Sequence, residues 1–351
     1  MVFGLGKKKG ILGLDIGSSS IKLAELKEGK SGYKLVNLGE TFLPPTAIVN
    51  KSIVDPESVI EAISMLIDDL KVRSRNVVFS LSGHSINIKK VSLPLMDEKE
   101  LKEAIPWELE QYIPYSINEV NYDFQILPGE NAEGNMDVLI VAAKKDVTGT
   151  YIDIVTEAGL NPVVLDVDVF ALENMYEINY EPTSEVVALA NIGANVTNIN
   201  ILKEGTTFFT RDITSGGEQF TELIMNEFNV AHEAAEEMKF SITADDVPSE
   251  LDRLARDFTD SLSNEIKRTI EFFSKTLWKD NVQRIFLSGG SSKIPYFVET
   301  LGHSTGASVE VIDPFRNISY SDSEFDPEYL MDIGPKMGVV LGLATRRMED
   351  R

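Results

Sequence analysis

The feature of this sequence that most constrains its fold is a motif that occurs twice, half a chain apart. The stretches LDIGSSSIKL and LANIGANVTNI each place a turn of small residues between two apolar, strand-like runs. Asp15 and Asn191 occupy the same place in the two stretches and are 176 positions apart in a chain of 351 residues. Because strand, turn and strand all recur, we interpret the two halves as a duplication of one β-rich unit.

Length and charge narrow the class of protein further. A chain of 351 residues is longer than one typical domain, so we expect at least two hydrophobic cores. The formal net charge of −23 disfavours binding to nucleic acid or to an anionic membrane surface, because a negative field repels phosphates. Any bound phosphate therefore needs backbone N–H groups and a few nearby cations.

Metal and disulfide chemistry is also restricted by composition. The chain has no cysteine, which excludes disulfides and thiolate metal sites, and it has only three histidines, His84, His232 and His303. The apolar run before the first lysines is too short for a signal peptide, and no stretch of about 18 consecutive apolar residues occurs. We expect a soluble protein of the cell interior.

Between the two repeats, the pattern indicates a smaller unit of mixed structure. NVVFSLSG and SINIKKVSLP are predicted to form a hairpin that leads to Pro94. Asp97 and Glu100 have the spacing of a capping box, so a helix is predicted to follow them and to end before Pro114. Two strands and a second helix, from Asp146, complete an α+β unit of about 70 residues.

Three turns of small residues follow apolar strands in this chain. Glycine removes the side chain and permits positive φ, so successive backbone N–H groups can converge on an anion. One such turn is usually an ordinary turn, but three of them in a duplicated chain indicate a site for a nucleotide. The three turns are Gly17 to Ser20, Gly193 to Asn195 and Gly289 to Ser292.

Four stretches resemble the motifs of the superfamily that contains actin, sugar kinases and DnaK-type chaperones. LDIGSSSIKL, LANIGANVTNI, FLSGGSSKIP and MGVVLGLATR resemble its first phosphate loop, second phosphate loop, adenosine motif and closing interdomain helix. The long stretch AIPWELEQYIPYSINEVNYDFQIL is similar to the type IV pilus assembly protein PilM family, which is related to FtsA. The resemblance implies an α/β fold with duplicated, ribonuclease H-like actin lobes and an FtsA-type α+β insert in the first lobe.

The same resemblance implies a division of the chain into domains. We expect the first lobe at 1–93 and 164–185, closed by a C-terminal helix at 335–351. The inserted subdomain is expected at 94–163. The second lobe is expected at 186–334 and includes a helical subdomain at about 218–283.

The resemblance also implies ATP or ADP with Mg²⁺ as cofactors, and it assigns nucleotide contacts residue by residue. Asp15 is expected to hold the metal ion through water, and Lys22 to neutralise charge beside it. Glu265 and Arg268 are expected at the ribose and base. The complete set of expected nucleotide contacts is Asp15, Gly17, Ser18, Ser19, Ser20, Lys22, Asn191, Gly193, Ala194, Asn195, Gly216, Gly217, Glu218, Glu265, Arg268, Gly289, Gly290, Ser291 and Lys293.

One position departs from the pattern of active members of the superfamily. The second phosphate loop usually begins with aspartate, and here Asn191 keeps the shape but not the charge. A carboxylate there helps to orient metal-bound water, so we expect nucleotide binding with slow hydrolysis or none. Asp166 and Asp168 are the weak candidates for an acidic residue near the attacking water, and no other catalytic residue is assigned.

The family resemblance further implies a partner and a location. Proteins of this family are cytoplasmic and bind the N-terminal cytoplasmic tail of the membrane protein PilN, so contact with the membrane is expected to be indirect. Other inner-membrane and motor components of the pilus machine are further expected partners, and self-association is left open. Aromatic residues are enriched in 94–127, and most of them are expected in the core, with one or two lining the groove for the tail.

Two other functions fit the same fold. An FtsA-like cell-division protein would polymerise with ATP or sediment with membranes. A small-molecule kinase would need a carboxylate to take a proton from the acceptor hydroxyl, yet no Asp or Glu occurs between Asn76 and Met96. Both alternatives remain less favoured than an ATP-binding scaffold, and whether the chain is an enzyme stays undecided from the sequence.

Overall fold

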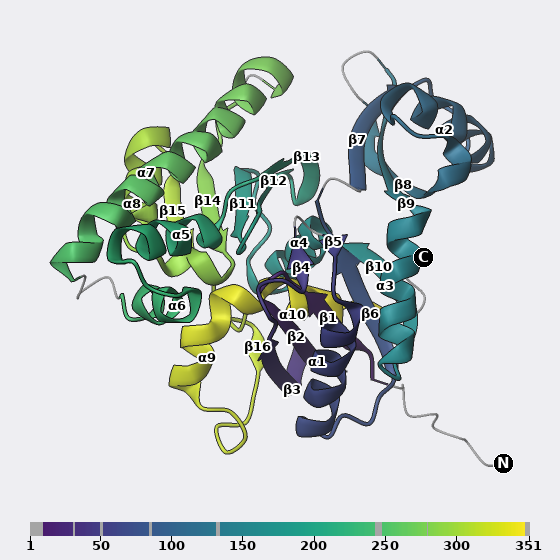
Figure 1. The fold of residues 1–351 in the computed structure, drawn as a ribbon. Coiled ribbons are helices and arrows are strands. Elements are labelled where there is room, and N and C mark those ends of the chain that lie inside the picture. The colour runs from purple at the N-terminus through teal and green to yellow at the C-terminus, as the bar shows by residue number, and fades with distance from the viewer. Residues whose placement is uncertain are drawn as a thin grey trace.

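The computed structural model describes residues 10–30, 32–49, 52–83, 86–130, 134–242, 248–278 and 280–347. Two lobes, each built on a mixed β-sheet, lie side by side, and a smaller unit with its own sheet extends from the first lobe (Figure 1). In the part of the chain described, no helix is long and apolar enough to cross a membrane.

The first lobe is built on a six-stranded sheet with the order β10-β6-β1-β2-β3-β16. The β1–β2 and β2–β3 pairs are antiparallel, whereas the β1–β6 and β6–β10 pairs are parallel. The strands are β1 (Leu12–Ile16), β2 (Ser20–Gly29), β3 (Gly32–Phe42), β6 (Asn76–Leu81), β10 (Asn161–Val167) and β16 (Ile318–Ser319). A short separate ribbon is formed by β4 (Ile48–Val49) and β5 (Ser52–Ile53).

The second lobe repeats this topology. Its sheet has the order β13-β12-β11-β14-β15, with the first three strands antiparallel and the last two pairs parallel. The predicted duplication is therefore confirmed, and it extends from three strands to five in each lobe. The strands are β11 (Val186–Ile192), β12 (Thr197–Lys203), β13 (Thr206–Ile213), β14 (Arg284–Ser288) and β15 (Ser308–Val311).

The insert contains a three-stranded antiparallel sheet in the order β7-β9-β8, covered by one helix. Helix α2 (Glu98–Tyr112) begins at the predicted capping box, in which Asp97 accepts from the Glu100 N–H at 2.8 Å. Its buried residues join those of the sheet in a core of their own. The strands are β7 (Ile86–Leu93), β8 (Val120–Glu130) and β9 (Met136–Lys144), and a 3₁₀ turn, η1 (Ile117–Glu119), precedes β8.

Two predictions about this region are wrong. Strand β7 pairs with β9 and not with β6, so the hairpin predicted before Pro94 does not form. Helix α3 (Lys145–Glu157) buries Tyr151, Ile154 and Val155 in the core of the first lobe and not in that of the insert. Both errors have the same cause. The sequence pattern shows that a strand or helix has an apolar face, but it does not show which other element packs on that face. The boundaries at 94 and 163 stay a prediction.

Two helices cross between the lobes. Helix α4 (Asp168–Asn179) follows β10, and helix α10 (Gly338–Ala344) packs against it and against β1. The backbones are in direct contact, because a Cβ on Gly342 would lie 1.7 Å from the Ala171 carbonyl oxygen. The predicted closing helix 335–351 is shorter in the structure, since the chain leaves the helix after Ala344 and the Arg346 side chain turns to Asp166 at 2.7 Å. Residues 348–351 lie outside the described part.

The remaining helices pack on the two sheets or on one another (Figure 1). Helix α1 (Pro56–Asp69) begins at the predicted cap Asp55, which accepts from the Ser58 N–H at 3.2 Å. The apolar face predicted for the long helix α7 is buried in the core of the second lobe. The other helices are α5 (Gly217–Phe228), α6 (His232–Phe240), α7 (Ser249–Phe272), α8 (Phe297–Thr305) and α9 (Pro327–Ile333), with the short turns η2 (Phe273–Trp278), η3 (Gly290–Lys293) and η4 (Gly334–Met337).

Candidate functional site

The first glycine turn is a tight loop between β1 and β2. The Gly17 N–H donates to the Ser20 carbonyl oxygen at 3.1 Å, and Ser19 accepts from the Leu43 N–H at 2.9 Å. Gly17 has little space for a side chain, because a Cβ there would lie 3.0 Å from the Ser20 oxygen. The turn thus places Ser18 and Ser19 at the end of the sheet with their backbone near the expected phosphates.

A row of charged side chains lies directly behind this turn. Asp15, Lys22 and Glu40 are neighbours across β1, β2 and β3, so they project from the same face of the sheet. The Lys22 Nζ lies 3.2 Å from Asp15 Oδ2, and the lysine is buried. Burial by itself would lower the pKa of Lys22, but Asp15, Glu40 and Asp168 together raise it above its ordinary value. Lys22 is therefore a fixed positive charge at the foot of the turn.

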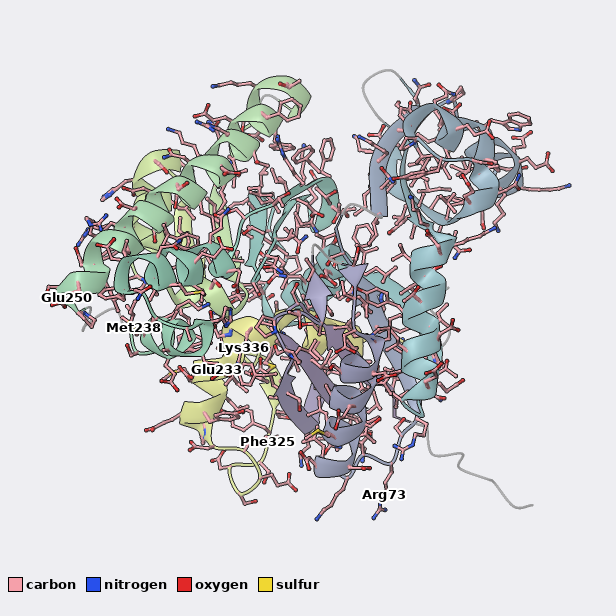
Figure 2. The ribbon with its side chains drawn as sticks, viewed as in Figure 1. Arg73, Glu233, Met238, Glu250, Phe325 and Lys336 are labelled. Carbon is pink, nitrogen blue, oxygen red and sulfur yellow. The ribbon has the colours of Figure 1, made fainter. Side chains whose placement is uncertain are left out.

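Glu40 connects this row to the C-terminal part of the chain. It accepts from Ser20 Oγ at 2.8 Å and forms an ion pair with Lys336 of η4. Figure 2 shows Lys336 where the C-terminal segment passes between the two lobes. A second cation thus reaches the first turn from a segment that is distant in the sequence.

The second glycine turn has the same backbone and a different charge. The Gly193 N–H donates to the Val196 oxygen at 3.1 Å, which reproduces the bond that closes the first turn. Behind it, Asn191, Asn198 and Asp212 are neighbours across β11, β12 and β13. Asn198 donates to Asp212 Oδ1 at 2.7 Å. The row Asp–Lys–Glu of the first lobe is thus Asn–Asn–Asp in the second.

The Gly216–Gly217 pair is bound to the second turn through backbone groups. The Gly217 and Glu218 N–H groups donate to the Gly193 and Ala194 oxygens at 2.9 and 2.8 Å. A Cβ on Gly216 would lie 2.5 Å from both of these oxygens. The structure therefore brings the predicted Gly pair and the second phosphate turn together, and glycine at 216 is what permits their contact.

The third glycine turn meets both of these elements. Gly289 has a φ of +91°, and a Cβ there would lie 2.3 Å from the Ile192 oxygen and 2.8 Å from Asn191 Oδ1. A Cβ on Gly217 would lie 2.0 Å from Ser291 Oγ. The predicted second turn, Gly pair and adenosine motif are therefore contiguous. They form one small-residue surface at the carboxyl ends of β11 and β14.

Three predicted contacts form no side-chain bond to this surface among the described residues. Glu265 and Arg268 are exposed on α7, and neither side chain forms a hydrogen bond or an ion pair with any described residue. Lys293 is exposed and forms an ion pair with Asp332 of α9. The assignment of Glu265 and Arg268 to ribose and base stays a prediction.

The two acidic candidates for the attacking water have different surroundings. Asp166 is buried and bonded to Arg346, so its charge is already neutralised. Asp168, at the start of α4, accepts from Ser80 Oγ at 2.6 Å, and its negative charge contributes to the raised pKa values of both Lys22 and Tyr151. Asp168 is therefore the acid that lies near the charged row of the first turn.

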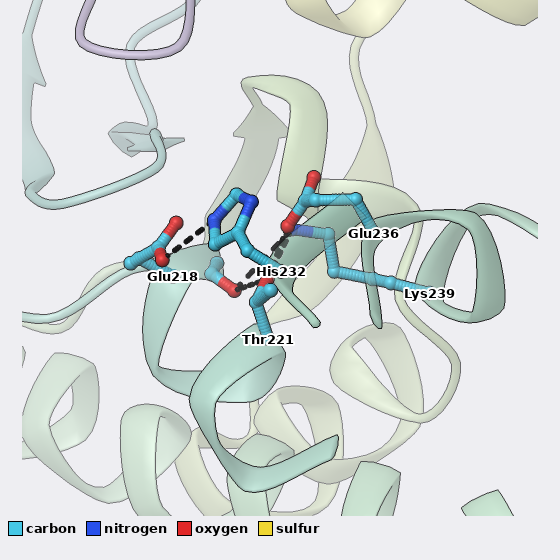
Figure 3. A network of polar contacts seen from close by, with 6 residues as sticks. Glu218, Thr221, His232, Glu236 and Lys239 are labelled. Atoms are coloured by element: carbon cyan, nitrogen blue, oxygen red, sulfur yellow. Dashed lines mark hydrogen bonds and ion pairs between the residues drawn. The ribbon is translucent and has the colours of Figure 1, made fainter. Parts of the chain in front are cut away.

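A polar network that the sequence reasoning missed lies beside the Gly pair (Figure 3). The Lys239 Nζ donates to Thr221 Oγ1 at 2.7 Å and to the Gly217 oxygen at 3.4 Å, and it forms an ion pair with Glu236. His232 Nε2 lies 2.9 Å from Glu218 Oε1. A signal was present in the sequence, because Glu236 and Lys239 are three residues apart on the helix that follows the Gly-pair helix.

This network resembles a metal site only in part. Glu218, His232 and Glu236 can each offer one ligand atom, and these atoms lie within 4.8 Å of one another. The Lys239 ammonium is bonded to Glu236, so a cation already occupies part of this cluster. We therefore assign the network to the contact of α6 with α5 beside the Gly pair and not to a metal ion.

A cleft of about 300 Å³ lies where the insert meets both lobes, and it reaches Asn198 and Asp212 of the second row. Strands β7 and β13, each at the edge of its sheet, form two of its walls. Lys90 of β7 links these walls, because its Nζ lies 3.7 Å from the centre of the Phe208 ring and 2.6 Å from Asp137. The residues that line the cleft are Ser82, Gly83, Ile86, Asn87, Ile88, Lys89, Val167, Asp168, Val169, Asn198, Thr210, Arg211 and Asp212.

Duplicated sheets, crossing helices and facing glycine turns define a two-lobed protein with the actin-like fold. The ethanolamine utilization protein EutJ from Carboxydothermus hydrogenoformans is similar, with a TM-score of 0.57 and 17% identity over 96% of this chain and 88% of that chain. MreB5 of Spiroplasma citri, bound to ADP, has a TM-score of 0.52 and 12% identity over 95% and 94% of the two chains. At these identities the likeness concerns the fold.

The family is defined by a closer similarity. The sequence profile of the type IV pilus assembly protein PilM matches residues 13–348. A structure of the PilM-PilN type IV pilus biogenesis complex has a TM-score of 0.87 and 32% identity, over 98% of this chain and 100% of that chain. This chain belongs to the type IV pilus assembly protein PilM family.

Proposed function

We propose that this protein is a cytoplasmic scaffold of the pilus assembly machine that binds ATP or ADP with Mg²⁺ between its lobes. The observation that carries the proposal is the contact of the second turn, the Gly pair and the Gly289 turn, together with a first turn that has the same closing bond. A protein this acidic can hold phosphates only where backbone N–H groups and cations gather. Lys22 and Lys336 are the cations at the first turn.

The residues of the first turn fit a hydrated magnesium ion. Mg²⁺ keeps several waters and is usually held by one or two carboxylates together with the phosphates. Asp15 supplies a carboxylate at the end of β1, and Lys22 holds it at 3.2 Å. When bound, the ion would neutralise phosphate charge, while Asp15 would orient its waters.

The second turn supports binding more than hydrolysis. Asn191 is the counterpart of Asp15 and cannot orient a metal-bound water through a charge. Asp168 remains as a carboxylate near the first turn, but it already accepts a hydrogen bond from Ser80. We therefore propose turnover that is slow or absent, so that the nucleotide acts by holding the lobes together.

Binding and turnover can be measured separately. Calorimetric titration of the full chain with Mg²⁺-ATP should show one site, and phosphate release should stay near background over hours. Gly216→Ala should abolish binding if it leaves the fold intact, and Gly149→Ala is its control because Gly149 has helical backbone and a Cβ there meets nothing within 4 Å. If the wild type bound neither ATP nor ADP, the proposal would be wrong. Many turnovers per second would contradict the claim of slow hydrolysis.

We further propose that the cleft at β7 and β13 receives the cytoplasmic N-terminal tail of PilN, which would place the protein at the inner membrane through its partner. The similar structure is a complex of PilM with PilN, which supports PilN as the partner. An extended peptide can add to the edge of a sheet, and this cleft lies between two such edges. The cleft borders the insert through β7, although no residue of 94–127 is among its lining residues.

The tail proposal is tested by filling the cleft. Thr210→Trp adds bulk at the lining, and Thr206→Trp adds the same bulk at the other end of β13, outside the lining residues. Titration with a synthetic PilN tail peptide should lose at least tenfold in affinity with Thr210→Trp only. If both variants bound the peptide with the affinity of the wild type, the tail would have to bind at another surface.

A further inference from the structure

Helix α2 has one apolar side that is buried and one tryptophan on the opposite side. Leu101, Ile105 and Leu109 are the buried residues and pack on the insert's sheet. Trp107 is 72% exposed. At about 100° per residue, Trp107 lies nearly opposite the middle of the buried side. It therefore points away from the sheet and contributes little to the core of the insert.

Acidic residues surround this tryptophan on the helix surface. Glu100, Glu103 and Glu110 all lie within about 60° of Trp107 around the helix axis and are exposed. One exposed lysine, Lys99, lies about 80° from Trp107 at the start of the helix, and Lys102 is bonded to Glu98 at 2.7 Å on another side. We call Trp107, Glu100, Glu103 and Glu110 the α2 face.

Apart from Glu100, which belongs to the capping box, the α2 face is not explained by the stability of the helix. The capping box fixes the start of α2, and the three buried residues supply its apolar contacts. A tryptophan left in water forgoes the free energy that its large apolar surface gains on burial. Its aromatic ring does, however, attract a cation placed over it, most strongly when both are removed from water. Three carboxylates around such a ring complement an arginine or lysine on a partner.

We propose that the α2 face binds an arginine- or lysine-bearing segment of a partner protein, with one cation over the Trp107 ring and others at the glutamates. A second copy of this chain fits poorly, because each copy carries a formal net charge of −23. The face is also separate from the cleft at β7 and β13, whose lining contains no residue of α2. The inference thus stands independently of nucleotide and tail binding.

The test uses the full chain and a helical 16-residue peptide with four arginines on one side. A variant of the protein with Trp278→Phe leaves Trp107 as the one fluorophore of its kind. Adding the peptide should change the Trp107 emission, whereas the same peptide with glutamines in place of the arginines should not. Raising the salt should weaken binding, as expected for contacts between exposed charges.

Variants with the same change of charge at two places distinguish binding to the α2 face from attraction to the net negative charge of the protein. Glu103→Lys with Glu110→Lys, and separately Trp107→Ala, should each weaken binding at least tenfold by calorimetry. Asp322→Lys with Glu324→Lys makes the same change of charge in an exposed loop and should weaken it less than twofold. These side chains are exposed, and unchanged thermal unfolding would verify that the variants fold.

Three results would overturn the proposal. Equal weakening by the loop variant and the helix variant would mean that the peptide responds to net charge only. Dimerisation by sedimentation that disappears with Trp107→Ala would assign the face to a second copy. Loss of PilN-tail binding with Trp107→Ala would make the face part of the tail site. Failure of ATP or tail binding in the wild type, by contrast, would affect only the proposed function.

Discussion

The two glycine turns have the same backbone and differ in charge. Each is closed by a glycine N–H that donates to the residue three positions on, at 3.1 Å in both lobes. Behind the first turn lie Asp15, Lys22 and Glu40, and behind the second lie Asn191, Asn198 and Asp212. The duplication has kept the shape that presents N–H groups. It has placed the ion pair in one lobe only.

This difference separates two tasks that one site has to perform. Charge at the first turn can hold a metal ion and neutralise phosphate. The second turn, which has neutral amides and is bound to the Gly pair and to Gly289, supplies a rigid shape. A site organised in this way favours a nucleotide that stays bound, because the position at the turn carries a carboxylate, Asp15, in the first lobe and an amide, Asn191, in the second.

The largest expected effect concerns the rigid side. Gly216→Ala places a Cβ 2.5 Å from two carbonyl oxygens, so we expect the free energy of unfolding to fall by about 3 kcal/mol. Gly17→Ala meets one oxygen at 3.0 Å and should cost about 1 kcal/mol. Urea unfolding of both variants measures the two values. If Gly17→Ala lowered the free energy of unfolding more than Gly216→Ala does, the more rigid turn would be the one in the first lobe.

The next effect tests the ion pair of Asp15 with Lys22. The variants replace these residues with the asparagines found at the matching positions of the second lobe. Asp15→Asn leaves the buried Lys22 with fewer opposite charges and should lower the free energy of unfolding by about 2 kcal/mol. Adding Lys22→Asn reproduces the pair Asn191 and Asn198 and should recover part of that loss. Magnesium should strengthen ATP binding to the wild type but to neither variant. A double variant that is less stable than the single one would contradict this account.

A smaller effect is expected when charge is added to the second row. Asn191→Asp gives that turn a carboxylate in the position of Asp15, so phosphate release in Mg²⁺-ATP should rise about tenfold, which corresponds to about 1.4 kcal/mol of activation free energy. Asn195→Asp, in the same turn but outside the row, is the control. An unchanged rate with intact ATP binding would show that the absent charge does not limit turnover.

The smallest effect concerns Glu173. Glu40 forms an ion pair with a lysine, whereas the Glu173 carboxylate accepts hydrogen bonds from uncharged groups only. Glu173 on α4 accepts from Thr207 N at 3.0 Å and from the Thr207 hydroxyl, which joins α4 to β13. Burial raises the pKa of Glu173 from 4.5 to about 7, and the Thr207 bonds offset this only in part. The folded state therefore binds the extra proton between pH 4.5 and 7, and stability should fall as the pH rises through that window.

Glu173→Gln removes this titration and tests its sign. At about pH 8 the variant should be more stable than the wild type by about 1 kcal/mol, and its stability should change less between about pH 5 and pH 7. Glu181→Gln, an exposed change just after α4, should leave the wild-type dependence in place. The same slope in the Glu173→Gln variant would place the titrating group elsewhere.

The sequence predicted those parts of the site that depend on local backbone rules. Gly17, Gly193 and Gly289 follow strands and were identified because small residues mark turns, and Asn191 was identified because the repeat supplied a reference. Aligning the two repeats places Asn191 at the position of Asp15, so the loss of a carboxylate there could be predicted. The counterpart of Lys22, Asn198, became apparent only from the strand register.

What the sequence did not predict depends on which elements pack together. Strand β7 has the pattern of a hairpin strand, but its partner is β9, which follows only after α2 and β8. Glu265 and Arg268 have suitable chemistry and lie on an exposed part of α7, whereas Lys239 is at the Gly pair because α5 and α6 pack together. Spacing along one helix indicates a face, but only tertiary contacts show what that face meets.

The contact between α4 and α10 determines how the lobes can move. At Gly342 the two backbones approach so closely that even a methyl group would overlap the Ala171 carbonyl. Sliding of one helix along the other would bring larger side chains into that contact, so it is blocked by close packing. Rotation about the contact is the motion that remains. The crossing thus holds the two helices in one register, and any change in the angle between the lobes would have its axis near Gly342.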